Sequence, residues 1–175
     1  MDDARNGARD GAQHGLQDGL HDEAFMQRAL EQAEAALAAG QAPFGAVIVD
    51  GTGGILGEGH NQVRADRDPS AHGEVVAIRN AIRRLDSGKL PPGTTLYTSC
   101  EPCLLCAVVI AQLGIGRVVF AARGTDVPGA KRLLDADLSQ AVPWINAQPG
   151  WTPMRLRGDL MREEALRSMA AFDWG

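Results

Sequence analysis

The sequence predicts an α/β domain with three layers, in which helices cover both faces of a central sheet. Segments with the apolar period of a helix alternate along the chain with short segments rich in β-branched residues. The chain has 175 residues, a length that suits one globular domain, and no internal repeat or linker divides it. The composition, 45% hydrophobic and 22% charged, is that of an ordinary globular protein.

Residues 1–21 are rich in Gly, Asp, Ala and Gln and lack periodicity, which predicts a mobile leader before a single domain over residues 22–175. Asp22 is the expected N-cap of the first helix, which Gly40 ends. Two β-rich segments then flank the stretch "GTGG", a pattern typical of a hairpin. These two expected strands cover residues 45–50 and 55–59.

The middle of the chain is expected to hold two helices and two strands after a polar loop over residues 61–70. Residues 71–85 have helical period, and "SGKLPPG" then breaks the chain before a strand at residues 94–99. The apolar segment 102–114 is the next expected helix, and a glycine stops it. Residues 117–122 complete this part as a strand.

The last part of the chain begins with a loop and a short expected helix at residues 130–136. A segment rich in Pro and Gly follows over residues 142–153, where no regular element is expected. A last strand at residues 154–157 leads to a C-terminal helix over residues 159–171. The sheet is therefore expected to contain five strands.

The net charge of −5 restricts the class of partner. A nucleic-acid binder usually carries a basic face, so the charge argues against nucleic acid but leaves a local basic patch open. Basic residues gather towards the C-terminus, where a solvated helix face is expected: Lys131, Arg132, Arg155, Arg157, Arg162 and Arg167. Without a signal-like or membrane-spanning apolar run, we expect a cytoplasmic protein with no membrane partner.

All three cysteines lie in the stretch "SCEPCLLC", residues 99–106. In a reducing compartment such a cluster indicates a metal site or catalysis rather than disulfides. Pro102 suits the first turn of a helix, which would place Cys103 and Cys106 one turn apart on the same face. An iron–sulfur cluster would need a fourth cysteine. A zinc site and a thioredoxin-like redox pair both remain compatible with the spacing.

The upstream stretch "AHGE" offers His72 as a third zinc ligand, with Glu74 two residues later. A site of one His and two Cys leaves the fourth zinc position open, as catalytic sites do. Zinc there would activate a water molecule, and Glu74 could move its proton. Either residue alone would more often cap a helix. Together they form H-x-E…P-C-x-x-C, a signature of zinc-dependent nucleobase deaminases.

Residues 22–125 resemble the cytidine deaminase-like superfamily, in the branch of bacterial guanine deaminases, yeast-type cytosine deaminases and tRNA adenosine deaminases. The matching stretches are "APFGAVIVD", "GEGHN", "DPSAHGEVVAIRNA", "TLYTSCEPCLLC" and "IGRVVFAA". The resemblance implies a mixed five-stranded sheet, a homodimer and hydrolytic loss of ammonia from a base or nucleoside. It also implies Zn²⁺ held by His72, Cys103 and Cys106, with Glu74 as proton shuttle.

The resemblance further implies contacts between the chain and a base. Asn61 matches an asparagine that hydrogen-bonds the base, although a turn at the strand end would explain it equally. The N–H of Gly73 and the carbonyl of Glu101 match main-chain contacts. Phe44 is a candidate for the pocket wall, with a plain core role as the alternative.

Three features of the sequence bear on the choice of base. Asp126 follows Thr125 as in guanine deaminases, where the aspartate contacts the purine and assists proton transfer, so the resemblance makes Asp126 a second catalytic candidate. Capping of the short helix after it is the alternative. Gly73 replaces the alanine usual in guanine and tRNA deaminases, and "HGE" is closer to yeast-type cytosine deaminases. The ending "FDWG" makes Asp173 and Trp174 candidates for a lid over the base, with anchoring of the last helix by Trp174 as the alternative. Guanine is the first expectation, with cytosine or tRNA adenosine next. A non-catalytic zinc-stabilised binding module is the alternative of another class.

Overall fold

The computed structural model describes residues 3–129 and 137–175, so the short helix expected at residues 130–136 lies outside it. Five strands form one sheet in the order β2-β1-β3-β4-β5. Their bounds are β1 Gly45–Val49, β2 Ile55–His60, β3 Thr95–Cys100, β4 Arg117–Ala122 and β5 Arg155–Arg157. β1 runs antiparallel to β2 and β3, while β3, β4 and β5 are parallel. The mixed five-stranded sheet confirms the prediction.

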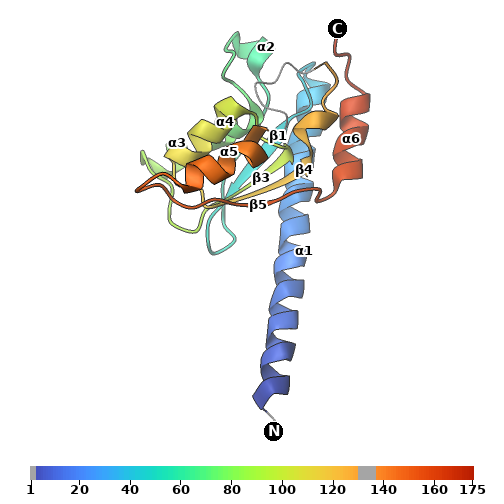
Figure 1. The fold of residues 1–175 in the computed structure, drawn as a ribbon. Coiled ribbons are helices and arrows are strands. Elements are labelled where there is room, and N and C mark those ends of the chain that lie inside the picture. The colour runs from blue at the N-terminus through green and yellow to red at the C-terminus, as the bar shows by residue number, and fades with distance from the viewer. Residues whose placement is uncertain (1–2, 130–136) are drawn as a thin grey trace.

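Helices cover both faces of this sheet, which confirms the three-layer α/β architecture (Figure 1). The helices are α1 Asp3–Ala38, α2 Val63–Asp66, α3 Gly73–Leu85, α4 Leu104–Gln112, α5 Asp137–Asn146 and α6 Arg162–Ala170. α1 and α6 pack on one face, and α3, α4 and α5 build the core on the other. The short α2 lies in the loop that was expected to be irregular.

α1 is longer than the sequence predicted. The expected start at Asp22 was wrong, because the helix already begins at Asp3 and continues through this position. No proline interrupts the preceding residues, and their Ala, Leu, Gln and Arg content is compatible with a helix despite the glycines. At its other end α1 stops before Gly40, whose φ of 70° lies in the left-handed region.

Asp22 joins α1 to three strands instead of capping the helix. Its buried carboxylate accepts a hydrogen bond from the Tyr97 hydroxyl at 2.7 Å and two from Arg117 at 2.8 and 2.6 Å. Arg157 on β5 donates a further one. Burial raises the pKa of Asp22, but the bonds from Arg117, Tyr97 and Arg157 outweigh it, so the pKa lies below its ordinary value.

Two glycines on β2 allow α3 to approach the sheet closely. A Cβ atom at Gly57 would lie 2.5 Å from the carbonyl oxygen of Ala77, and one at Gly59 would lie 2.4 Å from the nitrogen of the same residue. A real Cβ does not tolerate such distances to a backbone, so both positions need glycine. The helix axis, and with it the N-terminus of α3, is thereby fixed against the hairpin.

Two other elements differ from the sequence prediction. α5 continues through Pro143, where an irregular segment was expected, because Leu138, Ala141 and Ile145 bury one face of this helix in the core. α6 begins at Arg162, later than expected. Asp159 and Met161 have φ values of 64° and 57°, which cannot continue a right-handed helix.

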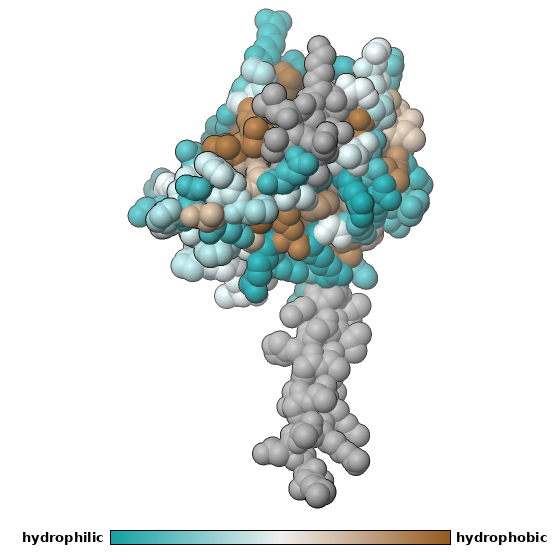
Figure 2. All heavy atoms as spheres, in the orientation of Figure 1, coloured by the Kyte–Doolittle hydropathy of each residue, from teal (hydrophilic) through white to brown (hydrophobic). Residues whose placement is uncertain are grey.

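Hydrophobic residues on the visible surface form scattered patches among hydrophilic ones (Figure 2). Leu105 and Val108 of α4 are exposed by 42% and 45%, and Trp144 of α5 by 65%. Within the described ranges, no helix has both the length and the apolar character needed to cross a membrane.

We predict that Asp22→Asn lowers the free energy of unfolding by about 1–3 kcal/mol, because it weakens charge-assisted bonds to Arg117 and Arg157. Chemical denaturation of the protein near pH 7 would measure the change in the free energy of unfolding. Asp86→Asn is the matched control, since Asp86 is an exposed αL residue and asparagine tolerates that conformation. Equal effects of the two substitutions would contradict the role of Asp22.

Candidate metal centre

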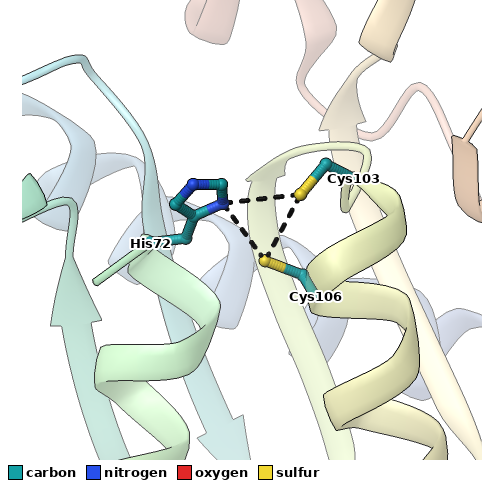
Figure 3. Close-up of side chains that lie close together, drawn as sticks. All are labelled: His72, Cys103 and Cys106. Atoms are coloured by element: carbon teal, nitrogen blue, oxygen red, sulfur yellow. Dashed lines mark hydrogen bonds between the residues drawn. The ribbon is translucent and has the colours of Figure 1, made fainter. Parts of the chain in front are cut away.

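His72, Cys103 and Cys106 point toward one another from the starts of two helices (Figure 3). Nδ1 of His72 lies 3.4 Å from each sulfur, and the two sulfurs lie 3.8 Å apart. His72 is the N-cap of α3 and Cys103 is the N-cap of α4. Pro102 therefore precedes α4 rather than occupying its first turn, but Cys103 and Cys106 still lie one turn apart as predicted.

The three donor atoms fit a tetrahedral zinc ion. Zinc binds cysteine sulfur at about 2.3 Å and histidine nitrogen at about 2.0–2.1 Å, which separates tetrahedral ligands by about 3.8 Å for two sulfurs and about 3.6 Å for sulfur and nitrogen. The observed separations of 3.8 and 3.4 Å are close to these values. One His and two Cys also leave a fourth position open for water or substrate.

The electrostatics of the cluster favour a cation between the two sulfurs. The hydrogen bond between Cys103 and Cys106 lowers the pKa of Cys103 to about 4. Burial raises this pKa, and the contact with His72 lowers it further. The hydrogen bond between the two cysteines and burial raise the pKa of Cys106 far above its ordinary value. Cys103, by its hydrogen bond, raises the pKa of His72. A second thiolate at Cys106 would repel the thiolate of Cys103. A divalent cation bound by both sulfurs would offset this repulsion.

Glu74 lies in the first turn of α3, close to the cluster but outside its set of donor atoms. Its side chain is buried, with 6% exposure. Burial and the nearby Cys103 thiolate raise the pKa of Glu74 to about 7. His72 and a hydrogen bond with Cys106 lower this pKa, but by less. A buried carboxyl beside a three-ligand site is suited to proton transfer rather than to metal binding.

A family comparison agrees with this geometry. Residues 20–122 match the cytidine and deoxycytidylate deaminase zinc-binding region. The chain belongs to this deaminase family. All three clustered ligands and Glu74 fall inside the matched residues. This family is zinc-binding, which agrees with the cofactor that the cysteine and histidine spacing predicted.

Relatives within the deaminase family differ in substrate. A tRNA-specific adenosine deaminase of Haemophilus influenzae is 44% identical over 57% of this chain and 57% of its own length. The chain thus spans little more than half of that relative. A guanine deaminase of Bacillus subtilis is also 44% identical, over 62% of this chain and 69% of its own. The solved guanine deaminase of Nitrosomonas europaea has a TM-score of 0.72 at 28% identity, covering 85% of this chain and 82% of its own.

Cys100, the third cysteine, is not part of the cluster. It is buried at the end of β3, on the α1 side of the sheet, whereas Cys106 packs on the other side. Its sulfur lies 3.7 Å from the carbonyl oxygen of Arg123. Burial, together with nearby carboxylates, raises the pKa of Cys100 well above its ordinary value, so it stays a neutral core thiol.

Three of the predicted substrate contacts adjoin one another. The N–H of Asn61 donates to the carbonyl of Phe44 at 2.8 Å, and a Cβ at Gly73 would lie 2.8 Å from that same oxygen. Asn61 is buried, and its Oδ1 accepts a hydrogen bond from the N–H of Val63. The turn role left open for Asn61 is thus present, and its contact with a base stays a prediction.

The C-terminus reaches the same region. The rings of Trp174 and Phe44 lie 5.9 Å apart, and those of Trp174 and Phe172 lie 5.0 Å apart edge to face. The indole N–H of Trp174 donates to the carbonyl of Met169, which anchors the ring to α6. Asp173 is exposed, and its carboxylate accepts a hydrogen bond from Gly175. The structure therefore brings Trp174, but not the Asp173 carboxylate, into contact with Phe44.

Asp126 is engaged with groups outside the cluster. Both of its carboxylate oxygens accept hydrogen bonds from Arg162, at 2.6 and 2.9 Å, and one also accepts the N–H of Arg123 at 2.8 Å. The bond from Arg162 lowers the pKa of Asp126. The bond from Arg123 closes the short turn over Gly124–Asp126. The helix that Asp126 was expected to cap falls on residues 130–136, outside the described ranges, and the contact of Asp126 with a purine stays a prediction.

The side chain of Glu101 has a role that the sequence did not indicate. Its buried carboxylate accepts hydrogen bonds from the N–H of Gly124 at 3.2 Å, and from the N–H and hydroxyl of Ser139 at 2.9 and 2.5 Å. It thereby ties the segment just before Cys103 to the loop after β4 and to α5. Its partners are 23 and 38 residues away in the chain, so no local pattern could have revealed them.

We predict that Cys103→Ser and Cys106→Ser each lose zinc, whereas Cys100→Ser keeps about one zinc per chain, because only the first two sulfurs face His72. Metal analysis after dialysis would measure the occupancy, and circular dichroism would confirm that each variant is folded. Cys100→Ser is the matched control in the same eight-residue stretch. Zinc loss from the Cys100 variant equal to the others would refute the two-thiolate site.

Proposed function

We propose that this protein is a zinc-dependent hydrolase that removes an amino group, as ammonia, from a nucleobase or nucleoside. The observation that carries the proposal is the buried Glu74 beside an open site of one His and two Cys. A structural zinc site closes its fourth position with another ligand and has no use for a buried carboxyl next to it. A redox dithiol has no use for the histidine at 3.4 Å from both sulfurs.

Different residues of the chain would bind zinc, transfer protons and orient the base. His72, Cys103 and Cys106 would hold the zinc, which supplies a Lewis acid that makes water nucleophilic near neutral pH. Glu74 accepts a proton from the attacking water and delivers it to a ring nitrogen. It then accepts the remaining proton of that oxygen and delivers it to the leaving amine, so that ammonia departs and a carbonyl remains. Asn61, the N–H of Gly73 and the carbonyl of Glu101 orient the base, with Phe44 as part of the wall.

Guanine is the substrate that we favour. The aromatic contact between Trp174 and Phe44 comes from the same chain and suits a closed pocket for a small planar base. The Bacillus subtilis relative and the Nitrosomonas europaea structure are both guanine deaminases. An adenosine in tRNA is the second candidate, because the Haemophilus influenzae relative has the same 44% identity. Cytosine is the third, from the resemblance of "HGE" and the C-terminal tryptophan.

A second copy of the chain is the protein partner that we expect. Leu105 and Val108 are large apolar residues exposed on α4, on either side of Cys106 in the chain. Burial of such side chains against the same surface of another copy would remove them from water. We infer the dimer from the resemblance to the deaminase family and from the exposed side chains of Leu105 and Val108.

We predict that Glu74→Gln lowers ammonia release by at least about 10²-fold, because the amide cannot carry the proton. The zinc content should not change, since Glu74 is not among the clustered donor atoms. Glu23→Gln on the exposed surface of α1 is the control for the same chemical change. Turnover that survives in the Glu74 variant would refute the mechanism, and a wild-type protein that releases no ammonia from any base would favour a binding module.

We predict that the wild-type protein releases ammonia from guanine faster than from guanosine, cytosine or adenine. A tRNA anticodon arm that contains adenosine completes the comparison, with an arm that carries inosine at the same position as its control. The contact between the rings of Phe44 and Trp174 is the physical reason to expect a small planar base. Activity confined to the anticodon arm would overturn guanine and establish the tRNA alternative.

A further inference from the structure

A pocket lies at the opposite end of the sheet from the metal centre. Its volume is about 500 Å³, within the range of about 300–1,000 Å³ usual for small-ligand sites. Thr95, Arg117 and Arg155 line it, and these are the first residues of the parallel strands β3, β4 and β5. The metal centre follows the carboxyl end of β3, so the strands separate the two sites.

Three arginines converge on this pocket. Arg117 and Arg155 are partners in register on the neighbouring strands β4 and β5, and Arg157 lies two residues further along β5. Paired residues of parallel strands share a face of the sheet, so the three side chains point to the same side. Like charges on directly paired positions repel each other. The arrangement is therefore unfavourable unless negative charge is supplied nearby.

The carboxylates in the pocket wall supply only part of that charge. Asp22 binds Arg117 and Arg157, and Oδ1 of Asp50 is already used by Thr52 and Gly54 in its own turn. Arg155 is exposed, and among the described side chains it forms no ion pair. Among the residues whose side chains the structure describes, three arginines thus face two carboxylates in this pocket, in a chain whose net charge is −5.

Asp22 also prepares the site for a ligand. Its bonds hold the Arg117 and Arg157 guanidinium groups in place, so less side-chain freedom is lost when a ligand binds. Arg157 donates one of its N–H groups to Asp22. A guanidinium offers five N–H donors, so free donors remain on Arg155 and Arg157 for the oxygens of an anion.

We propose that this pocket binds the phosphate of a small phosphorylated ligand, a nucleoside monophosphate by class. The guanidinium groups match phosphate oxygens in charge and in geometry. Phe25 forms part of the wall and packs on Tyr97 with ring centroids 5.2 Å apart, which offers an aromatic surface for a base or sugar. The site is separate from the metal centre and does not depend on the proposed deaminase function.

Tyr97 provides a reporter inside the pocket, because it is the only tyrosine in the chain. The zinc-loaded protein would be prepared with ¹³C-ring-labelled tyrosine and titrated with uridine monophosphate, whose base has no exocyclic amino group to hydrolyse. We expect the Tyr97 resonances to shift with saturation, and no shift with uridine. Arg155→Ser should weaken binding by about tenfold or more, as expected for loss of a charge-assisted bond.

Arg83→Ser is the matched control, because Arg83 is exposed on α3, which packs on the other face of the sheet. It removes the same charge and should leave the affinity unchanged. A uridine tetranucleotide without terminal phosphates distinguishes an RNA backbone from a free phosphate ester. The proposal is overturned if uridine monophosphate leaves Tyr97 unshifted, if Arg155→Ser and Arg83→Ser weaken binding equally, or if only the tetranucleotide binds.

Discussion

The N-termini of α3 and α4 must meet at one point, and the candidate centre depends on this constraint. His72 and Cys103 are the N-caps of these helices, and their donor atoms lie 3.4 Å apart. α4 starts where β3 ends, while the glycines of β2 let α3 approach the sheet closely. Free N–H groups at both helix starts favour the thiolates that a zinc site needs. The metal geometry is thus set by how two helices pack on one sheet.

The ligands could be predicted from sequence because their chemistry is local. Two cysteines three residues apart, and a histidine two residues before a glutamate, are short patterns with a direct geometric meaning. Asp22 could not be interpreted in the same way. Its local context predicts an N-cap, but its partners Tyr97 and Arg157 are 75 and 135 residues away. Local patterns therefore located the metal ligands, whereas the residues that position the elements depend on long-range contacts.

Long-range contacts also explain why the elements predicted for the C-terminal part of the chain differ from those in the structure. Pro143 predicted a break, but burial of one face of α5 outweighs the lost backbone hydrogen bond, so the helix continues. The expected start of α6 failed because Asp159 adopts a left-handed conformation while its carboxylate binds Arg123. With Arg162 bound to Asp126, these pairs fix α6 beside β4. That position in turn brings Trp174 to Phe44.

Gly73 now has a physical explanation that bears on the substrate. The sequence pattern "HGE", in place of an expected alanine, pointed towards cytosine deaminases. In the structure a Cβ at this position would lie 2.8 Å from the carbonyl oxygen of Phe44, so alanine would force the backbone of Phe44 away from α3. The glycine is required by this close approach, whichever base is bound. The glycine is therefore not evidence for cytosine as the substrate. The groups around Phe44 and Asn61 must determine which base is bound.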